Sequence, residues 1–156
     1  MIEYSLIRLI PSEELHREFS YQVKKAAEGD YIAQIWGWDE NFQRDFHAEV
    51  WQQKRPDIVT YDNKPIGTIS IIENEDYIEI RQFFLLPEYQ RQGIGSYLLK
   101  RILDKADRSG LITRLAYLKN NPVVSLYKRH GFQISDVIEN FCFMERKPDD
   151  SANIQG

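Results

Sequence analysis

A switch from strand-like to helical spacing within residues 83–99 constrains the fold most. An apolar run stops at Pro87, a polar turn follows, and apolar residues return with helical spacing at Ile94, Leu98, Ile102 and Ala106. The pattern predicts a strand, a tight loop and the N-terminus of a helix. Gly93 and Gly95 allow the loop backbone to turn tightly and to approach a ligand closely. The N–H groups of a first helical turn, with the positive end of the helix dipole behind them, favour phosphate as that ligand.

Two common phosphate-binding patterns do not match this loop. A dinucleotide loop requires a third glycine where Leu98 stands. A nucleoside triphosphate loop requires Gly-Lys-Ser/Thr, whereas Gly95 is followed by Ser96 and Tyr97. A nucleotide-phosphate domain is therefore disfavoured, and an ordinary strand-to-helix turn is the alternative that the glycines alone leave open.

The composition is typical of one folded domain. The chain has 156 residues, 42% of them hydrophobic, and a net charge of −4, so nothing indicates nonspecific nucleic-acid binding and a cationic substrate is mildly favoured. Cys142 is the only cysteine, and no apolar run reaches the length of a membrane span. The three histidines lack the spacing of metal ligands. We expect a cytoplasmic protein with no metal.

The apolar periodicity predicts a mixed α/β chain. Strands are expected at 5–10, 58–61, 66–72, 77–86, 111–118, 132–137 and 141–145, and helices at 13–28, 39–53, 94–109 and 122–130. The first helix is expected to be capped by Ser12 and to end before Gly29, with an apolar face of Leu15, Phe19, Val23 and Ala27. Asp39 is expected to cap the second, whose inner face is Phe42, Phe46 and Val50. The chain should form one domain over 1–147, and the polar residues 148–156 a disordered tail.

A second motif lies in residues 121–132, Asn-Pro-Val-Val-Ser-Leu-Tyr-Lys-Arg-His-Gly-Phe. It resembles the C-terminal signature of the GNAT acyltransferase superfamily, Asn-Pro-Ala-x-x-Leu-Tyr-x-x-x-Gly-Phe, with Val123 in place of alanine. The loop at residues 90–95 resembles the acetyl-CoA signature of the same superfamily, Gln/Arg-x-x-Gly-x-Gly/Ala. The resemblance extends over residues 58–147, whereas the first fifty-odd residues match only in helix placement.

The resemblance implies a mixed, mainly antiparallel sheet that is flanked by helices and splays at a parallel pair of strands, 77–86 and 111–118. It also implies an N-acetyltransferase that moves an acetyl group from acetyl-CoA to a primary amine of a small molecule or a protein. The implied cofactor contacts are the backbone of Phe83, Phe84 and Leu85 for the pantetheine arm, the N–H groups of Gln90, Arg91, Gln92, Gly93, Ile94, Gly95 and Ser96 for the pyrophosphate, and Asn121 and Tyr127 at the thioester.

Two residues are candidates for proton transfer. Tyr127, with an ordinary pKa of about 10, could protonate the departing thiolate, whose ordinary pKa is about 8.5. It could instead be a core tyrosine with a satisfied hydroxyl. Glu79 could be the base for the amine, but an ion pair with Arg81 or a neighbouring strand is the alternative, and some superfamily members use ordered water. Asn121 could act only as a helix cap.

The resemblance implies that the helical region with Trp36, Trp38, Asp39 and Glu40 covers the acceptor cleft. Aromatic rings beside carboxylates would suit an amine there. A helix cap with core tryptophans is the alternative. The motif strand has no candidate cysteine nucleophile, so direct transfer is expected. A non-catalytic acyl-CoA-binding sensor or interaction module is the second functional hypothesis. The closing hairpin and exposed strand edges offer a homodimer interface; no nucleic-acid or membrane partner is expected.

Overall fold

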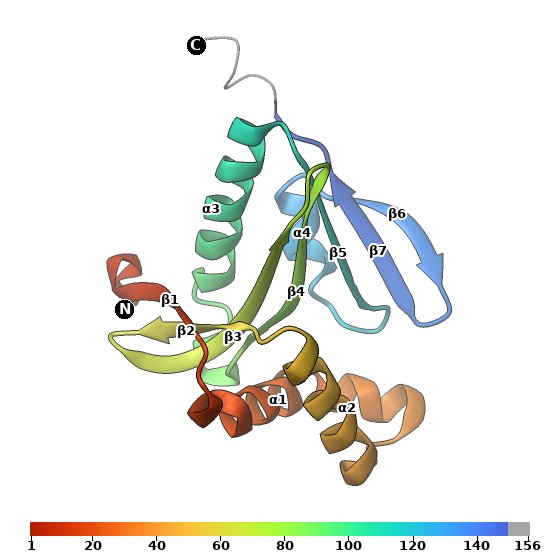
Figure 1. The fold of residues 1–156 in the computed structure, drawn as a ribbon. Helices are drawn as coiled ribbons and strands as arrows, with labels where there is room; N and C mark the ends of the chain where they lie inside the picture. The colour runs from red at the N-terminus through yellow and green to blue at the C-terminus, as the bar shows by residue number, and fades with distance from the viewer. Residues whose placement is uncertain (150–156) are drawn as a thin grey trace. The chain divides into compact units, whose positions relative to one another are not determined.

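The computed structural model describes residues 1–149, which form a mixed α/β fold (Figure 1). The helices are α1 (Arg17–Trp36), α2 (Glu40–Gln53), α3 (Ile94–Ser109) and α4 (Val124–Arg129), with three short 3-10 turns at Tyr4–Leu6, Glu14–His16 and Pro87–Tyr89. The strands are β1 (Ile7–Pro11), β2 (Asp57–Tyr61), β3 (Lys64–Glu73), β4 (Tyr77–Leu85), β5 (Ile112–Leu118), β6 (Gln133–Ile138) and β7 (Phe141–Arg146). Of the expected tail at 148–156, all but the first two residues lie outside the described part.

The described strands form one sheet in the order β1-β2-β3-β4-β5-β7-β6. β4 and β5 are parallel, whereas the pairs β1–β2, β2–β3, β5–β7 and β6–β7 are antiparallel. A helix connects β4 to β5, as a parallel pair requires. The predicted fold class, a mainly antiparallel sheet with one parallel pair and flanking helices, is confirmed.

The chain divides into two compact units. The first comprises Met1–Ser70 and Gln82–Ile94, and the second comprises Ile71–Arg81 and the described residues from Gly95 on. Each unit has its own buried residues, for example Ile58 and Ile66 in the first and Leu99 and Met144 in the second. The single domain over 1–147 stays a prediction.

The first unit corrects the expected N-terminal helix. Ser12 does not cap it; instead the Glu13 N–H donates to His16 Nδ1 at 2.9 Å, and α1 begins at Arg17. α1 also passes through Gly29 and ends at Gly37, whose φ is 77°. A Cβ on Gly29 would lie 3.6 Å from the Trp38 ring, so the missing side chain lets that ring pack against the helix. Leu15, expected in the core, is 74% exposed.

Helix α2 has the predicted bounds and cap, but its buried face is different. The Phe42 N–H donates to Asp39 Oδ1 at 3.1 Å, which confirms the cap. The expected inner residues Phe42 and Phe46 are 61% and 45% exposed. The buried residues of α2 are Gln43, His47 and Trp51. His47 has a hydrogen-bonding partner in Ser20 of α1, and Trp51 has one in Glu14 of the preceding 3-10 turn. Periodicity of apolar residues cannot anticipate such partners.

In the second unit, α3 and α4 both end at the glycines that the sequence predicted. Gly110, with φ 67°, follows α3, and the Leu111 N–H donates to the Ala106 carbonyl at 2.9 Å. α4 begins at Val124, so Pro122 is not its first residue, which is a correction. The Val123 N–H donates to Asn121 Oδ1 at 3.1 Å, and this turn before the helix replaces the expected cap. Gly131, with φ 90°, lies just beyond the end of α4, as predicted.

Candidate active site

The loop between β4 and α3 is held by its own side chains. Gln90 Nε2 donates to the Leu85 carbonyl at 2.9 Å, and Gln92 Nε2 donates to the Glu88 carbonyl at 2.6 Å. The Leu86 N–H donates to the Ile66 carbonyl at 2.9 Å, which joins the start of the loop to β3. The backbone of residues 85–92 is therefore fixed by contacts that do not involve a ligand.

Two residues of this loop have left-handed backbone conformations. The φ angle is 60° at Arg91 and 83° at Gly93. Consecutive N–H groups around such residues converge on a common point and can bind an anion. Because Ile94 then begins α3, the first N–H groups of that helix have no partner one turn earlier within it. This donor set fits the pyrophosphate of CoA, and the exposed Arg91 adds a positive charge.

The side chain of Tyr4 leaves no room for a Cβ on Gly93. The sequence did not predict this contact. The Tyr4 hydroxyl donates to the Gln92 carbonyl at 2.9 Å, and a Cβ on Gly93 would overlap the same hydroxyl. Tyr4 lies far from the loop in sequence and belongs to no motif, so no signal pointed to it. Gly95 has a different role, because a Cβ there would lie 3.4 Å from Leu126 of α4.

A second strained position interrupts β4 at Gln82. Its φ is 49°, which is unusual for a residue within a strand and is maintained by surrounding contacts. Thr68 Oγ1 donates to the Gln82 carbonyl at 2.8 Å, and Gln82 Nε2 donates to Ser70 Oγ at 3.0 Å and to the Lys54 carbonyl at 3.2 Å. Nothing in the residue type of Gln82 predicts this irregularity.

The predicted pantetheine-binding residues 83–85 directly follow Gln82. All three are partly exposed. A Cβ on Gly67 would overlap the Phe84 carbonyl oxygen and lie close to Leu85, so Gly67 lets β3 approach this segment. Gly67 is thus a positioning residue that the motif comparison missed.

The side chain of Tyr127 is 7% exposed and packed between two rings. Its ring centroid lies 6.1 Å from that of Tyr117 and 5.8 Å from that of Phe132. Burial, and then a hydrogen bond with the Cys142 thiol, raises the pKa of Tyr117 to about 12. Tyr117 therefore keeps its proton at neutral pH, and both neighbours restrict the orientation of the Tyr127 ring.

Glu79 forms an ion pair with Arg81, which was the alternative to a catalytic role for Glu79 in the sequence analysis. Its Oε2 lies 2.8 Å from a guanidinium nitrogen of Arg81. In the parallel register Glu79 is opposite Arg114, whose Nε donates to Glu145 Oε2 at 2.7 Å. A role for Glu79 as a base stays a prediction.

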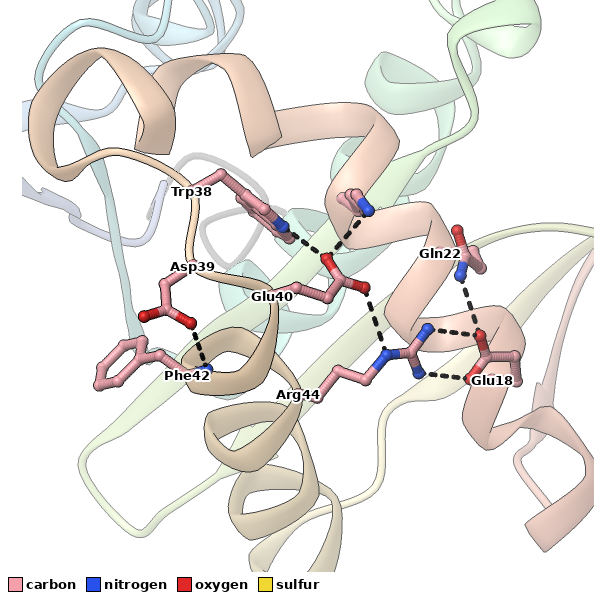
Figure 2. A network of polar contacts seen from close by, with 8 residues as sticks. Glu18, Gln22, Trp38, Asp39, Glu40, Phe42 and Arg44 are labelled. Atoms are coloured by element: carbon pink, nitrogen blue, oxygen red, sulfur yellow. Dashed lines mark hydrogen bonds and ion pairs between the residues drawn. The ribbon is translucent and has the colours of Figure 1, made fainter.

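The four predicted acceptor residues lie at the junction of α1 and α2 in the first unit. Figure 2 shows three of them, Trp38, Asp39 and Glu40. Glu40 accepts hydrogen bonds from Trp38 Nε1 at 2.7 Å, Lys25 Nζ at 3.0 Å and Arg44 Nε at 3.3 Å. The Trp38 and Lys25 bonds are the main causes that lower the pKa of Glu40 to about 2. Lys25 and Arg44 therefore already compensate the charge of Glu40. Trp36 is 55% exposed.

Comparison with known proteins identifies the family. The profile of the Acetyltransferase (GNAT) family matches residues 13–132, which is well over half of the chain. The chain belongs to the GNAT family. The match begins before the segment that carries the sequence motifs, so it includes α1 and α2.

One relative and two solved structures place this GNAT protein among others. An uncharacterized N-acetyltransferase of Methanocaldococcus jannaschii is 26% identical over 110 residues, 62% of this chain and 49% of that protein, so the alignment spans about half of the relative. The PaiA N-acetyltransferase of Thermoplasma acidophilum, solved with coenzyme A, has a TM-score of 0.71 at 21% identity and covers 90% of this chain and 98% of that chain. A GNAT family acetyltransferase of Elizabethkingia anophelis with acetyl-CoA bound has a TM-score of 0.64 at 17% identity, covering 91% and 98%. At these identities the structures establish the shared fold.

The predicted site residues of this GNAT chain are divided between the two units. Residues 83–85 and 90–94 belong to the first, and Glu79, Gly95, Ser96, Asn121 and Tyr127 belong to the second. In the described residues, no helix is long and apolar enough to cross a membrane, and no group of three or more His, Cys, Asp or Glu side chains is arranged to hold a metal.

Proposed function

We propose that this GNAT protein is an acetyl-CoA-dependent N-acetyltransferase, which moves an acetyl group to a primary amine of a small molecule or a protein by direct transfer. The observation that carries the proposal is the loop before α3, where left-handed Arg91 and Gly93 precede a helix N-terminus. The solved GNAT proteins named with coenzyme A or acetyl-CoA support it.

In this proposal the chain's backbone holds most of the cofactor. The N–H groups of residues 90–96 would bind the pyrophosphate, and the backbone of residues 83–85 would pair with the pantetheine arm. Asn121 and Tyr127 would lie toward the thioester, which supplies an activated acetyl group when acetyl-CoA is bound. A backbone N–H near Leu85 would stabilise negative charge on the acetyl oxygen.

The proton transfers are assigned to two side chains. In the transfer a bond forms between the amine nitrogen and the acetyl carbon, and the bond from that carbon to sulfur breaks. Glu79, or a water that it orients, would remove the amine proton, and Tyr127 would donate a proton to the sulfur. Trp36 and Trp38 would contact the acceptor, with Asp39 adding negative charge beside it. Glu40, whose charge Lys25 and Arg44 compensate, would hold the Trp38 ring through the indole N–H.

An acetylation assay on a panel of amines and peptides tests this proposal. Release of the CoA thiol should depend on both acetyl-CoA and an amine. Tyr127→Phe should lower kcat about a hundredfold and leave the affinity for acetyl-CoA unchanged. Tyr117→Phe is the matched control, because it removes a neighbouring hydroxyl from the same aromatic cluster. Equal turnover in wild type and Tyr127→Phe would remove Tyr127 from the mechanism.

One observation favours a second candidate function, a non-catalytic acyl-CoA-binding sensor. Glu79 Oε2 lies 2.8 Å from the Arg81 guanidinium, and this ion pair engages the carboxylate that the enzyme would need as a base. Tight acetyl-CoA binding with no turnover on the whole panel would support the sensor and contradict the enzyme.

The proposal also includes a cellular location and an oligomeric state. We propose a cytoplasmic location, because the single cysteine, Cys142, is a buried free thiol. We also propose a homodimer through the β6–β7 hairpin, where Ile138, Phe141 and Phe143 are exposed.

A further inference from the structure

Helix α2 presents aromatic side chains to solvent and polar side chains to α1. The Phe42 and Phe46 rings are nearly parallel, with an interplanar angle of 10° and centroids 6.4 Å apart. A surface helix ordinarily buries its apolar stripe. An exposed pair of large aromatic side chains therefore indicates an interaction surface.

The opposite face of α2 fixes this orientation. Ser20 Oγ of α1 lies 2.5 Å from His47 Nε2, and the His47 ring packs edge-on against Tyr21 with centroids 5.5 Å apart. Trp51 Nε1 donates to Glu14 Oε2 at 3.2 Å. Rotating α2 to bury the two phenylalanines would break these contacts, so the rings stay outside.

Two carboxylates lie on the same face as the rings. Phe42, Asp45, Phe46 and Glu49 have the spacing i, i+3, i+4 and i+7, which places them on one side of a helix, and all four are exposed. We call these four side chains the phenylalanine face. Among residues 1–149, neither Asp45 nor Glu49 has an ion-pair partner. By contrast, Glu18 of α1 pairs with Arg44, and Glu40 of α2 pairs with Lys25.

A cation of the chain already contacts this face. Lys24 Nζ of α1 lies 4.7 Å from the Phe46 ring centroid, which is a cation–π distance. An amino group of the chain itself therefore already contacts one of the two rings.

We propose that the phenylalanine face docks a basic segment of a protein acceptor. The inference rests on the proposed function, whose acceptor class it names. The four side chains extend over about 10 Å of helix, which matches about three extended residues of a peptide. A peptide with alternating cationic side chains could place one over the rings and another between Asp45 and Glu49. A small monoamine would contact only part of this length.

Peptide binding measured by fluorescence anisotropy tests the docking surface. The probe is a short labelled peptide in which arginine alternates with alanine, and the comparison peptide has glutamate in place of arginine. The wild-type protein should bind only the basic peptide. Phe42→Ala with Phe46→Ala should weaken that binding about tenfold, because both rings are lost. Equal binding of the two peptides, or no loss in this variant, would overturn the proposal.

Variants of the carboxylates separate a local effect from an effect of net charge. Asp45→Asn with Glu49→Gln should weaken binding and reduce its dependence on salt. The matched control, Glu75→Gln with Asp104→Asn, removes the same charge from two other exposed positions and should bind as the wild type does. An equal loss in both double variants would contradict a local site.

Two further measurements keep the outcomes distinct. A thermal shift with acetyl-CoA is recorded for every variant, because failure of cofactor binding would remove the proposed function and leave a measured peptide site standing. Intact cofactor binding without peptide binding would remove the docking surface alone. Sedimentation of the phenylalanine variant provides the other test: a change from dimer to monomer would show that a second copy covers this face and would overturn the peptide proposal.

Discussion

At the scale of single residues, the site depends on backbone conformations that side chains far away in sequence maintain. The motif indicated that Gly93 allows a ligand to approach. The structure adds that the Tyr4 hydroxyl occupies the space a Cβ would need. The glycine in the motif was visible in the sequence, whereas Tyr4 was not, because its contact is made by folding and not by spacing along the chain.

Gly93→Ala should be more destabilising than Gly110→Ala. Both positions have positive φ, 83° and 67°, so each alanine would carry backbone strain of about 1–2 kcal/mol. Only Gly93 has Tyr4 in the position of the added methyl group, since nothing lies within 4 Å of a Cβ on Gly110. Urea unfolding of both variants tests this. Tyr4→Phe should restore part of the loss in Gly93→Ala, and equal losses at the two glycines would show that the Tyr4 contact is unimportant.

Burial lowers the pKa of His47 to about 4. Because its ordinary pKa is about 6.5, the unfolded chain binds more protons at this residue between those two values. The free energy of unfolding should therefore rise with pH across this interval. The contribution of His47 to stability is present above pH 6.5 and is lost as the pH falls to about 4. Urea unfolding at several pH values should show a flatter profile for His47→Gln. An identical pH profile in the variant would mean that His47 is not the group responsible.

At the scale of secondary structure elements, the sequence predicted features that depend on neighbouring residues. It did not predict features that depend on contacts between helices. The Asp39 cap and the glycines after α3 and α4 act within one helix turn, so those helix ends were predictable. The buried face of α2 depends on Ser20 and Tyr21 of α1, which no periodicity reveals. The extension of α1 past Gly29 also depends on a contact with a distant residue. The Trp38 ring packs against the helix where Gly29 has no side chain.

The irregularity in β4 provides a prediction at this scale. Gln82→Ala removes the side-chain hydrogen bonds to Ser70 and Lys54 but keeps a Cβ at a φ of 49°. Gln82→Gly removes the same bonds and also relieves the strain. The glycine variant should therefore be more stable than the alanine variant by about 1 kcal/mol, measured by chemical unfolding. The reverse order would mean that this position is not strained in solution.

At the scale of the whole molecule, the two motifs predicted the parallel β4–β5 pair and the family. Both motifs lie in the second half of the chain. The first fifty residues have no such motif, and their helices were predicted less well. This division also explains why the cofactor is better supported than the acceptor, since α1 and α2 carry the residues expected to contact the amine.

The proposed function requires the loop before α3 to bind the pyrophosphate of acetyl-CoA. Thermal unfolding of the protein with acetyl-CoA, free CoA, ATP and NAD measures this binding. A ligand at about a hundred times its Kd adds about 2.7 kcal/mol to the free energy of unfolding. Acetyl-CoA and CoA should raise the Tm selectively. An unchanged Tm with both CoA compounds, or an equal rise with ATP and NAD, would contradict the proposed function.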